Sequence, residues 1–311
     1  MHEAVTQTGR FRHVVFPDGV GGYGRALNVT PPVPAADGRA VRPSASLTPD
    51  ADSLLRLLFS RAGIGLRHYK PETLARRLPA CLRALRASTP DQARAALRRN
   101  PELAAPAVDA LLIGVTAFFR DDCVFAALRQ TVLPELVSHR RAAGCVRPLR
   151  IWSAGCSCGA ELYSVALLLL EQGALWPGQC ELLGTDCRPE ALARAAAGVF
   201  EPAAVRAVPP TLLRRYFDFD GANFRVRADV RSALRWRHGD VLAAPEPGPW
   251  DLVLCRNLAI YLQPDAAATL WSHLVVSLRP GGVLVPGKAE RPLGVRGLIN
   301  LGPCLYTKDG G

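Results

Sequence analysis

The sequence of 311 residues contains no apolar run that is long enough to cross a bilayer. Its longest such run, Val165 to Leu170, is much shorter than the roughly 20 residues that a membrane-spanning helix needs. The first residues, Met1 to Ala4, lead into polar residues rather than an apolar core, which predicts no signal peptide. We therefore expect a cytoplasmic protein that does not insert stably into a membrane.

The sequence also lacks the two Cys/His pairs that a bound metal ion would need. The nine cysteines are odd in number, scattered, and mostly within apolar segments, which favours reduced thiols over a disulfide framework. Cys156 and Cys158 lie close together, but no second Cys/His pair accompanies them. We expect small residues that fill a tight turn, and no bound metal.

Acidic residues are outnumbered by basic ones. The 27 Asp and Glu face 38 Lys and Arg, so the formal net charge is +11, which suggests an acidic partner. Aromatic residues make up only 7% of the chain and do not alternate with the arginines between Arg67 and Arg99. This arrangement argues against nucleic acid as the partner.

Three regions of different composition divide the chain. Residues 1–50 are rich in Gly, Pro, Ala and Val, which predicts a flexible leader. Residues 51–115 carry leucines at helical spacing and predict a small all-helical domain. Pro79 interrupts this pattern, so we expect it to kink its helix or to break the helix into two. Residues 116–311 form the larger, third region.

The third region predicts an α/β fold with a mostly parallel sheet. Helical segments lie between most of the candidate strands, which favours a sheet with helices on both faces. The C-terminal segment 299–307 lacks a following helix and is expected to pair antiparallel. An insertion at about 216–232 contains an alternating segment and predicts a small β-ribbon. The candidate strands are Leu149–Trp152, Glu181–Thr185, Leu234–His238, Asp251–Cys255 and Gly282–Pro286.

A glycine turn follows the first strand and opens a helix. Such a turn presents backbone N–H groups to a ligand at the carboxyl end of the strand. Gly155 and Gly159 do not have the G-x-G-x-x-G spacing of dinucleotide-binding proteins. This argues against a dinucleotide ligand and favours a nucleoside ligand such as S-adenosyl-L-methionine (SAM). Asp186 ends the second strand, where a carboxylate commonly binds ribose hydroxyls. The alternative for Asp186 is a helix N-cap.

Several motifs resemble one protein family in order and spacing. They are Thr116-Ala117-Phe118-Phe119-Arg120, Trp152 to Ser157, Gly184-Thr185-Asp186, Cys255-Arg256-Asn257 and Ile260-Tyr261. Together they are similar to the CheR family, the chemoreceptor glutamate O-methyltransferases that use SAM. The resemblance runs from about Ser53 to about Tyr306. It implies a Rossmann-like methyltransferase sheet behind a small helical domain, with SAM as the cofactor.

The resemblance also implies roles for individual residues. Tyr261 lies near the methyl group, and Arg120 and Tyr261 together position the reacting groups. Arg77 and Arg83 hold the acidic helix of a receptor. Glu161 and Asp186 are the acids that contact the cofactor, with Asp186 on its ribose. The complete set of implied cofactor contacts is Thr116, Arg120, Glu161, Asp186, Asp240, Val241, Arg256 and Asn257.

Some of these residues have a simpler structural alternative. Glu161 suits the first turn of a helix because of the helix dipole, and Tyr261 suits a packed core. The arginines around Arg83 suit a solvated helix face. The sequence also departs from the family pattern at Gly114, Ala160 and Lys288, among other positions.

The expected function is the methylation of glutamate side chains on the cytoplasmic helices of chemoreceptors, by a monomer. A glutamate has an ordinary pKa of about 4.3, so it is ionised near neutral pH and requires no general base. Two alternatives stay open. One is a methyltransferase of the same fold with another acceptor. The other is a catalytically weak or inactive SAM-binding signalling or scaffold protein.

Overall fold

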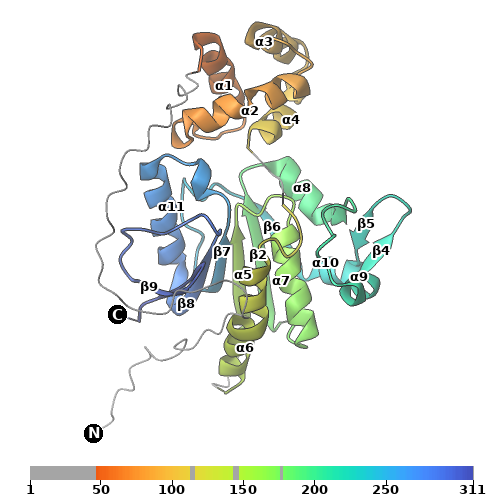
Figure 1. Ribbon diagram of the computed structural model, residues 1–311, viewed down its shortest axis with the longest axis vertical. Helices are drawn as coiled ribbons and strands as arrows, with labels where there is room; N and C mark the ends of the chain where they lie inside the picture. The colour runs from red at the N-terminus through yellow and green to blue at the C-terminus, as the bar shows by residue number, and fades with distance from the viewer. Residues whose placement is uncertain (1–46, 113–115, 143–146, 176–177, 311) are drawn as a thin grey trace, which may run out of the picture.

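The computed structural model describes residues 47–112, 116–142, 147–175 and 178–310. The expected leader, except for its last few residues, and Gly114 lie outside these ranges. The described chain forms a group of helices at one end of a larger α/β body (Figure 1). No helix among the described residues is long and apolar enough to span a membrane.

Four helices form the N-terminal group: α1 (Pro49–Arg61), α2 (Pro71–Ala84), α3 (Pro90–Arg99) and α4 (Ala104–Leu111). Helices α1 and α3 begin after Thr48 and Thr89, whose hydroxyls accept hydrogen bonds from backbone N–H groups of the first turn. Helix α2 runs unbroken past Pro79, so the proline does not break the helix into two, and the alternative of a kink stays a prediction. Pro79 is exposed, and water can satisfy the carbonyl group that the proline leaves without its helical N–H partner.

A seven-stranded sheet forms the larger body, in the order β6-β2-β1-β7-β8-β10-β9. Its strands are β1 (Leu149–Ala154), β2 (Cys180–Asp186), β6 (Leu234–His238), β7 (Trp250–Cys255), β8 (Leu278–Pro286), β9 (Leu298–Gly302) and β10 (Leu305–Lys308). The first five are parallel to one another, whereas β10 is antiparallel to β8 and to β9. The expected mostly parallel sheet with an antiparallel end is therefore confirmed.

Helices cover both faces of the sheet. Along β1, Ile151 joins a core cluster with helix α7 (Ala160–Glu171), whereas Trp152 joins a second cluster with helix α11 (Pro264–Ser277). Because successive side chains of a strand point to opposite faces, the two clusters lie on opposite sides of the sheet. The remaining helices of the body are α5 (Asp122–Ala127), α6 (Leu133–Ala142), α8 (Pro189–Ala197), α9 (Pro210–Tyr216) and α10 (Ala228–Ser232).

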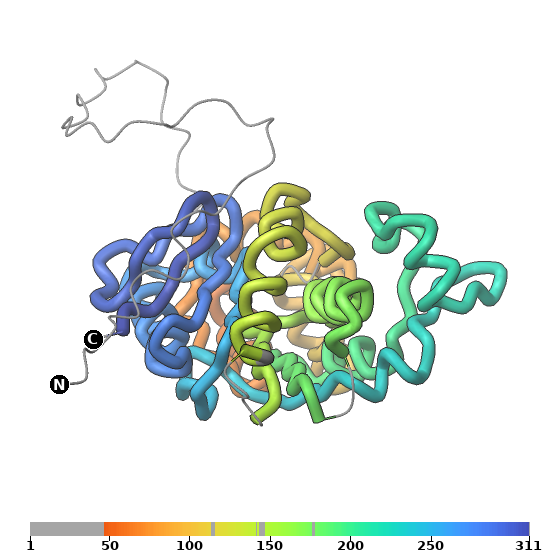
Figure 2. The backbone as a smooth tube through the Cα atoms, turned by 90° about the horizontal axis from the view of Figure 1, so that it is seen from below, coloured from red at the N-terminus to blue at the C-terminus, as the bar shows by residue number. Residues whose placement is uncertain are grey.

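A second, three-stranded sheet makes up the insertion. Strand β5 (Phe224–Val226) pairs antiparallel with β4 (Phe217–Phe219) and with β3 (Val199–Phe200). The insertion projects from one side of the body, as Figure 2 shows in the segment around residues 200–230. The small β insertion of the expected fold is therefore present.

The chain changes direction in the sheet between β1 and β7. From β1 it builds outward through β2 to β6, and it then returns to the other side of β1 to build β7 and β8. In open α/β sheets, ligands bind outside the carboxyl ends of the strands at such a switch point. Helices α2 and α4 lie above this edge of the sheet (Figure 1).

Candidate active site

A cavity of about 1100 Å³, counted out to its open mouth, lies at the switch point. Its floor is the carboxyl ends of β1, β2, β6 and β7, and its roof comes from α2, α4 and the loop before α5. The lining residues that carry polar side chains include Tyr69, Thr116, Arg120, Glu161, Asp186, Arg188, Asp240, Arg256, Asn257 and Tyr261.

The glycine turn after β1 forms one wall of the cavity. Gly155 and Gly159 have positive φ angles of 67° and 84°, which side chains rarely adopt. A Cβ at Gly159 would also lie 2.5 Å from the ring of Trp236, so only glycine fits there. The turn therefore brings backbone close to the cavity and starts helix α7 with its N-terminus facing the site.

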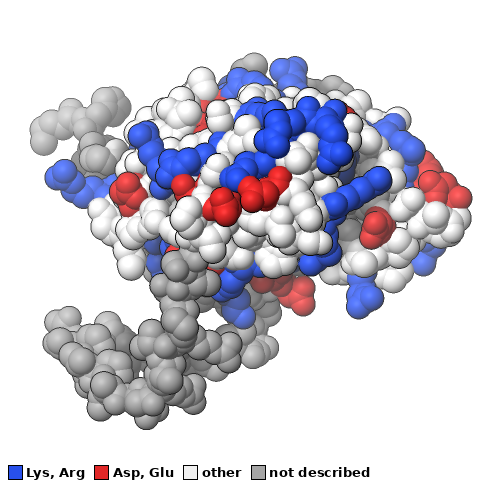
Figure 3. Space-filling model, turned by 90° about the horizontal axis from the view of Figure 1, so that it is seen from above, with Lys and Arg blue, Asp and Glu red and all other residues white. Residues whose placement is uncertain are grey.

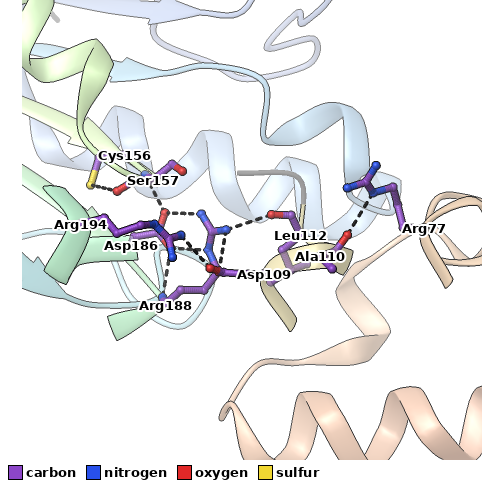
Figure 4. Close-up of polar contacts among 9 residues, drawn as sticks. All are labelled: Arg77, Asp109, Ala110, Leu112, Cys156, Ser157, Asp186, Arg188 and Arg194. Carbon is purple, nitrogen blue, oxygen red and sulfur yellow. Dashed lines mark hydrogen bonds and ion pairs between the residues drawn. The ribbon is translucent and has the colours of Figure 1, made fainter. Parts of the chain in front are cut away.

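Asp186 is buried at the end of β2 and faces the glycine turn. Its Oδ2 accepts a hydrogen bond from the Ser157 N–H at 2.8 Å, and its Oδ1 accepts one from the Arg188 N–H at 3.0 Å. The Arg188 guanidinium pairs with both oxygens, at 2.9 Å from Nε to Oδ1 and 3.3 Å from Nη2 to Oδ2 (Figure 4). Helix α8 is capped by Arg188 instead, so Asp186 is not its N-cap.

Arg256 holds the opposite wall of the cavity together. Its Nη1 lies 3.2 Å from Glu161 Oε2, and its Nη2 lies 2.6 Å from Asp121 Oδ2 and 2.6 Å from the Arg120 carbonyl oxygen. The Ser153 hydroxyl donates to the other oxygen of Glu161 at 2.8 Å. Burial raises the pKa of Glu161, and the nearby Arg256 opposes that shift. Arg256 thus connects the helix α7 acid to the loop that enters from the helical domain.

The end of β6 supplies a mixed polar and apolar wall. Asp240 accepts a hydrogen bond from the Leu242 N–H at 2.9 Å, and Val241 and Leu242 are buried beside it. Tyr69 from the helical domain lines the same cavity and is buried. Burial raises the pKa of the Tyr69 phenol well above its usual value, and the negative charge of Asp240 adds to the shift. Tyr69 therefore stays a neutral phenol.

The loop after β7 carries Asn257 and Tyr261 and is tied to the buried Glu290. Asn257 has a φ of 59°, a left-handed conformation that needs support from its surroundings. Glu290 accepts hydrogen bonds from the backbone N–H groups of Asn257 and Ile260, at 2.8 and 3.3 Å. Its carboxylate thus accepts the hydrogen bonds of backbone N–H groups in this loop and fixes the shape of the loop.

The helical domain is attached to the same loop. The Lys70 N–H donates to the Tyr261 carbonyl oxygen at 2.9 Å, and the Lys70 ammonium donates to the Ile260 carbonyl oxygen at 2.9 Å. Tyr69 also forms a single β-bridge with Leu262. These contacts place the roof of the cavity directly against the loop that carries Tyr261.

The structure brings most of the residues expected from sequence into one cavity. Its lining includes Thr116, Arg120, Glu161, Asp186, Asp240, Val241, Arg256, Asn257 and Tyr261. Arg77 and Arg83 are not among the lining residues. The Arg77 side chain donates to the Ala110 carbonyl oxygen at 3.1 Å and braces α2 against α4, whereas Arg83 is exposed. Their roles stay predictions.

Three residues at the site had no assigned role in the sequence analysis. Tyr69 and Glu290 belong to no ligand motif, so only their positions in the fold connect them to the cavity. Arg188 did have a signal, because it follows Asp186 by two residues, within reach of that carboxylate. Among the described residues, no group of three or more His, Cys, Asp or Glu could hold a metal ion.

The chemistry of the cavity fits SAM. A carboxylate at the end of β2 suits ribose hydroxyls, and the apolar Val241 and Leu242 suit a purine ring. Glu161 suits the ammonium group of the amino-acid portion, and the α7 N-terminus suits its carboxylate. Glu161, Asp186, Val241 and Leu242 are therefore the residues on which this fit rests.

Comparison with known proteins identifies two family regions. Residues 114–299 match the model described as CheR methyltransferase, SAM binding domain, and residues 49–112 match the CheR methyltransferase, all-alpha domain. A chemotaxis protein methyltransferase of Vibrio parahaemolyticus is 31% identical, and the match covers 80% of this chain and 91% of that protein. Chemotaxis protein methyltransferase 1 of Pseudomonas aeruginosa is 36% identical, over 59% of this chain and 68% of that protein. An uncharacterised 104.1 kDa protein of Rhodobacter capsulatus is 32% identical over 76% of this chain, which spans only 25% of that relative.

Proposed function

Because the chain belongs to the CheR methyltransferase family, we propose that it transfers the methyl group of SAM to glutamate side chains of chemoreceptors. The family's SAM-binding domain accounts for residues 114–299, so SAM is the cofactor. We further propose that the protein acts in the cytoplasm as a monomer, on the acidic cytoplasmic helices of its receptors.

The set of side chains that line the cavity supports a carboxylate as the methyl acceptor. No histidine or lysine is among the described lining residues. Burial raises the pKa of Cys187 to about 12 and that of Cys156 well above its usual value, so neither thiol acts as a base near neutral pH. A glutamate acceptor is already ionised and needs no base, unlike an amine or a hydroxyl group. This match between acceptor and site is the observation that carries the proposal.

SAM bound in this cavity would supply an electrophilic methyl group to the glutamate oxygen, and the products would be a glutamate methyl ester and S-adenosyl-L-homocysteine. The protein contributes position and exclusion of water. Tyr261 and Arg120 lie at the cavity on opposite loops and would orient the reacting groups. Asp186 and Glu161 would anchor the cofactor at its two ends. Methylation removes one negative charge from the receptor helix, which changes its packing.

Exposed arginines on the helical domain support an acidic protein partner. Figure 3 shows Lys and Arg side chains gathered over the face seen from above, with a smaller number of Asp and Glu side chains among them. The exposed arginines of this domain include Arg76 and Arg83 on α2, Arg86 just after α2, and Arg98 and Arg99 on α3. A cationic face of this kind attracts an acidic helix and speeds its association.

A second candidate function is SAM binding without turnover. The departures from the family pattern at Ala160 and Lys288 favour it, because the fold and the SAM-binding domain are kept while these positions differ. Such a protein would bind the cofactor and transfer no methyl group to any receptor preparation.

The deciding experiment incubates the protein with methyl-labelled SAM and membranes that contain the chemoreceptors of the same organism. Base-labile label on the receptor bands supports glutamate methyl esters, and membranes without chemoreceptors serve as the control. Absence of label on receptors, together with calorimetric binding of S-adenosyl-L-homocysteine, contradicts the proposed reaction and supports the second candidate. Base-stable label would indicate another acceptor.

A further inference from the structure

Arg188 connects the cavity to the helical domain through the two edges of its guanidinium group. One edge, Nε and Nη2, faces the Asp186 carboxylate at 2.9 and 3.3 Å. The Nη1 atom on the other edge donates to Asp109 Oδ1 at 3.2 Å and to the Leu112 carbonyl oxygen at 3.0 Å (Figure 4). The Arg188 side chain is only 8% exposed. The contacts therefore hold a buried cation between the second strand and helix α4.

The Asp186 carboxylate has no acceptor position left in this arrangement. An ionised carboxylate offers about four lone-pair sites. Two accept the backbone N–H groups of Ser157 and Arg188, and two accept the guanidinium N–H groups of Arg188. The backbone pair belongs to the turn itself. Ribose hydroxyls can therefore reach Asp186 only at the two sites that the guanidinium occupies.

Helix α4 and its C-terminal end provide partners for the Arg188 guanidinium after the guanidinium has left Asp186. Asp109 is a carboxylate on α4 with a side chain 17% exposed, and Leu112 caps the C-terminal end of this helix, where the helix dipole favours a cation. Arg194 of helix α8 also pairs with Asp109, at 2.7 Å. The guanidinium thus loses two of its partners on release from Asp186 and retains the other two.

We propose that Arg188 is a positioning residue that competes with the cofactor ribose for Asp186 and transfers its charge to Asp109 and the α4 end when the cofactor binds. The proposal rests on the proposed function, because it assumes that Asp186 receives the ribose. Cofactor binding then strengthens the contact between the body and the helical domain that carries Arg77 and Arg83. The cavity is thereby coupled to the surface proposed to hold the receptor.

Calorimetry with S-adenosyl-L-homocysteine tests the competition without any methyl transfer. Arg188→Met removes the competitor and is expected to tighten binding roughly tenfold, because a charged two-point contact no longer has to be broken. Asp109→Asn weakens the charged partner that Arg188 retains after release from Asp186, and it is expected to loosen binding a few-fold. In the double variant, Asp109→Asn should have no further effect, because the coupling runs through Arg188. Arg194→Met is the matched control, because it removes another cation that pairs with Asp109 and leaves the contact between Arg188 and Asp186 in place.

A cofactor analogue separates competition at the ribose from a general change in the cavity. S-(2′-deoxyadenosyl)-L-homocysteine lacks one of the two hydroxyls, so its gain in affinity from Arg188→Met should be clearly smaller. Arg188→Lys, which retains the charge without the two-point contact, should show an intermediate gain. This conservative variant keeps the test available if Arg188→Met fails to fold, as thermal unfolding would reveal.

A purely structural role for Arg188 predicts a different pattern. Arg188→Met and Arg188→Lys would then both loosen binding or leave it unchanged, and either result in folded protein overturns the proposal. Equal gains with the full cofactor product and its deoxy analogue would also overturn it. Failure of the unmodified protein to bind S-adenosyl-L-homocysteine would instead contradict the cofactor assignment on which the proposed function rests.

Discussion

Glu290 accepts a hydrogen bond from the backbone N–H of Asn257 at 2.8 Å, across 33 positions of the sequence. The same oxygen accepts the Gly287 N–H at 2.7 Å, and the residue is only 3% exposed. The carboxylate therefore joins the strand β8 end to the loop that carries Tyr261, on which the shape of the cavity depends.

Glu290→Gln should loosen this loop. An amide replaces one acceptor oxygen with a donor, which leaves at least one buried backbone N–H unpaired at a cost of about 1–3 kcal/mol. We expect a lower unfolding free energy and roughly tenfold weaker binding of S-adenosyl-L-homocysteine, measured by urea unfolding and calorimetry. Lys288→Ala changes an exposed side chain in the same segment and should leave both quantities unchanged. Unaltered binding in Glu290→Gln would show that the loop keeps its shape without this carboxylate.

Asp186→Ala should abolish measurable cofactor binding. The variant removes both oxygens proposed to receive the ribose hydroxyls, and two hydrogen bonds to a charged acceptor correspond to about 3 kcal/mol, or a hundredfold in affinity. Calorimetry with S-adenosyl-L-homocysteine measures the loss. Asp229→Ala, on the exposed face of α10, is the control and should bind normally. Normal affinity in Asp186→Ala would remove Asp186 from the site.

Tyr261→Phe should slow methyl transfer without weakening cofactor binding. The backbone carbonyl of Tyr261 keeps its hydrogen bond from Lys70, so the substitution removes the hydroxyl and little else. Loss of one orienting hydrogen bond is expected to lower kcat about tenfold, or about 1.4 kcal/mol. The rate of receptor labelling and the Kd of S-adenosyl-L-homocysteine separate the two effects. An unchanged kcat would favour a packing role for this phenol.

Arg83→Glu should raise the KM for the receptor and leave kcat within about twofold. Arg83 is exposed on α2, so its replacement changes the charge of the proposed receptor-binding face while leaving the cavity intact. The increase in KM should shrink at high salt, because exposed charges are screened. Arg235→Glu makes the same change at the opposite edge of the sheet, at the start of β6, and should have little effect. Equal effects of both variants would indicate a response to net charge alone.

Asp251 should make stability depend on pH in the acid range. Its carboxylate is fully buried, and each of its two oxygens accepts a hydrogen bond from the Arg147 guanidinium at 2.9 Å. It also accepts the Arg150 backbone N–H at 2.9 Å. Burial acts to raise the pKa of Asp251, but these hydrogen bonds, with that from Arg279, outweigh it and lower the pKa. The stabilisation is therefore complete above the unfolded pKa of about 3.9 and is lost as the pH falls below it.

Urea unfolding at several pH values measures this contribution. Asp251→Asn is expected to lower the unfolding free energy near neutral pH by about 3 kcal/mol, because it leaves buried donors with a weaker acceptor. The variant should also lose part of the decline in stability below about pH 4. Asp218→Asn changes an exposed ion pair and should shift stability by less than about 1 kcal/mol. Parallel acid profiles for Asp251→Asn and the unmodified protein would contradict the assignment.

The glycine turn and the positions of the parallel strands along the chain could be predicted because their signals are local. An apolar strand, a turn that needs positive φ angles and a helix are each encoded within a few consecutive residues. Parallel strands of one sheet present their carboxyl ends at the same edge, so Asp186 and Asp240 were expected to meet at the cavity, as they do. The same local reasoning allowed a break of the helix at Pro79, which does not occur, because the reasoning did not include the exposure of that helix face.

The partners of the site residues depend on contacts between distant segments. Arg188 contacts Asp109, 79 positions earlier, and Arg77 contacts the Ala110 carbonyl oxygen, 33 positions later. Such pairs leave no periodic signal, since they form only when the helical domain packs against the edge of the sheet. The sequence alone therefore determined the type of fold and the acids of the cavity. Tertiary packing decided which of those acids is already paired, because burial brings charges together that are far apart along the chain.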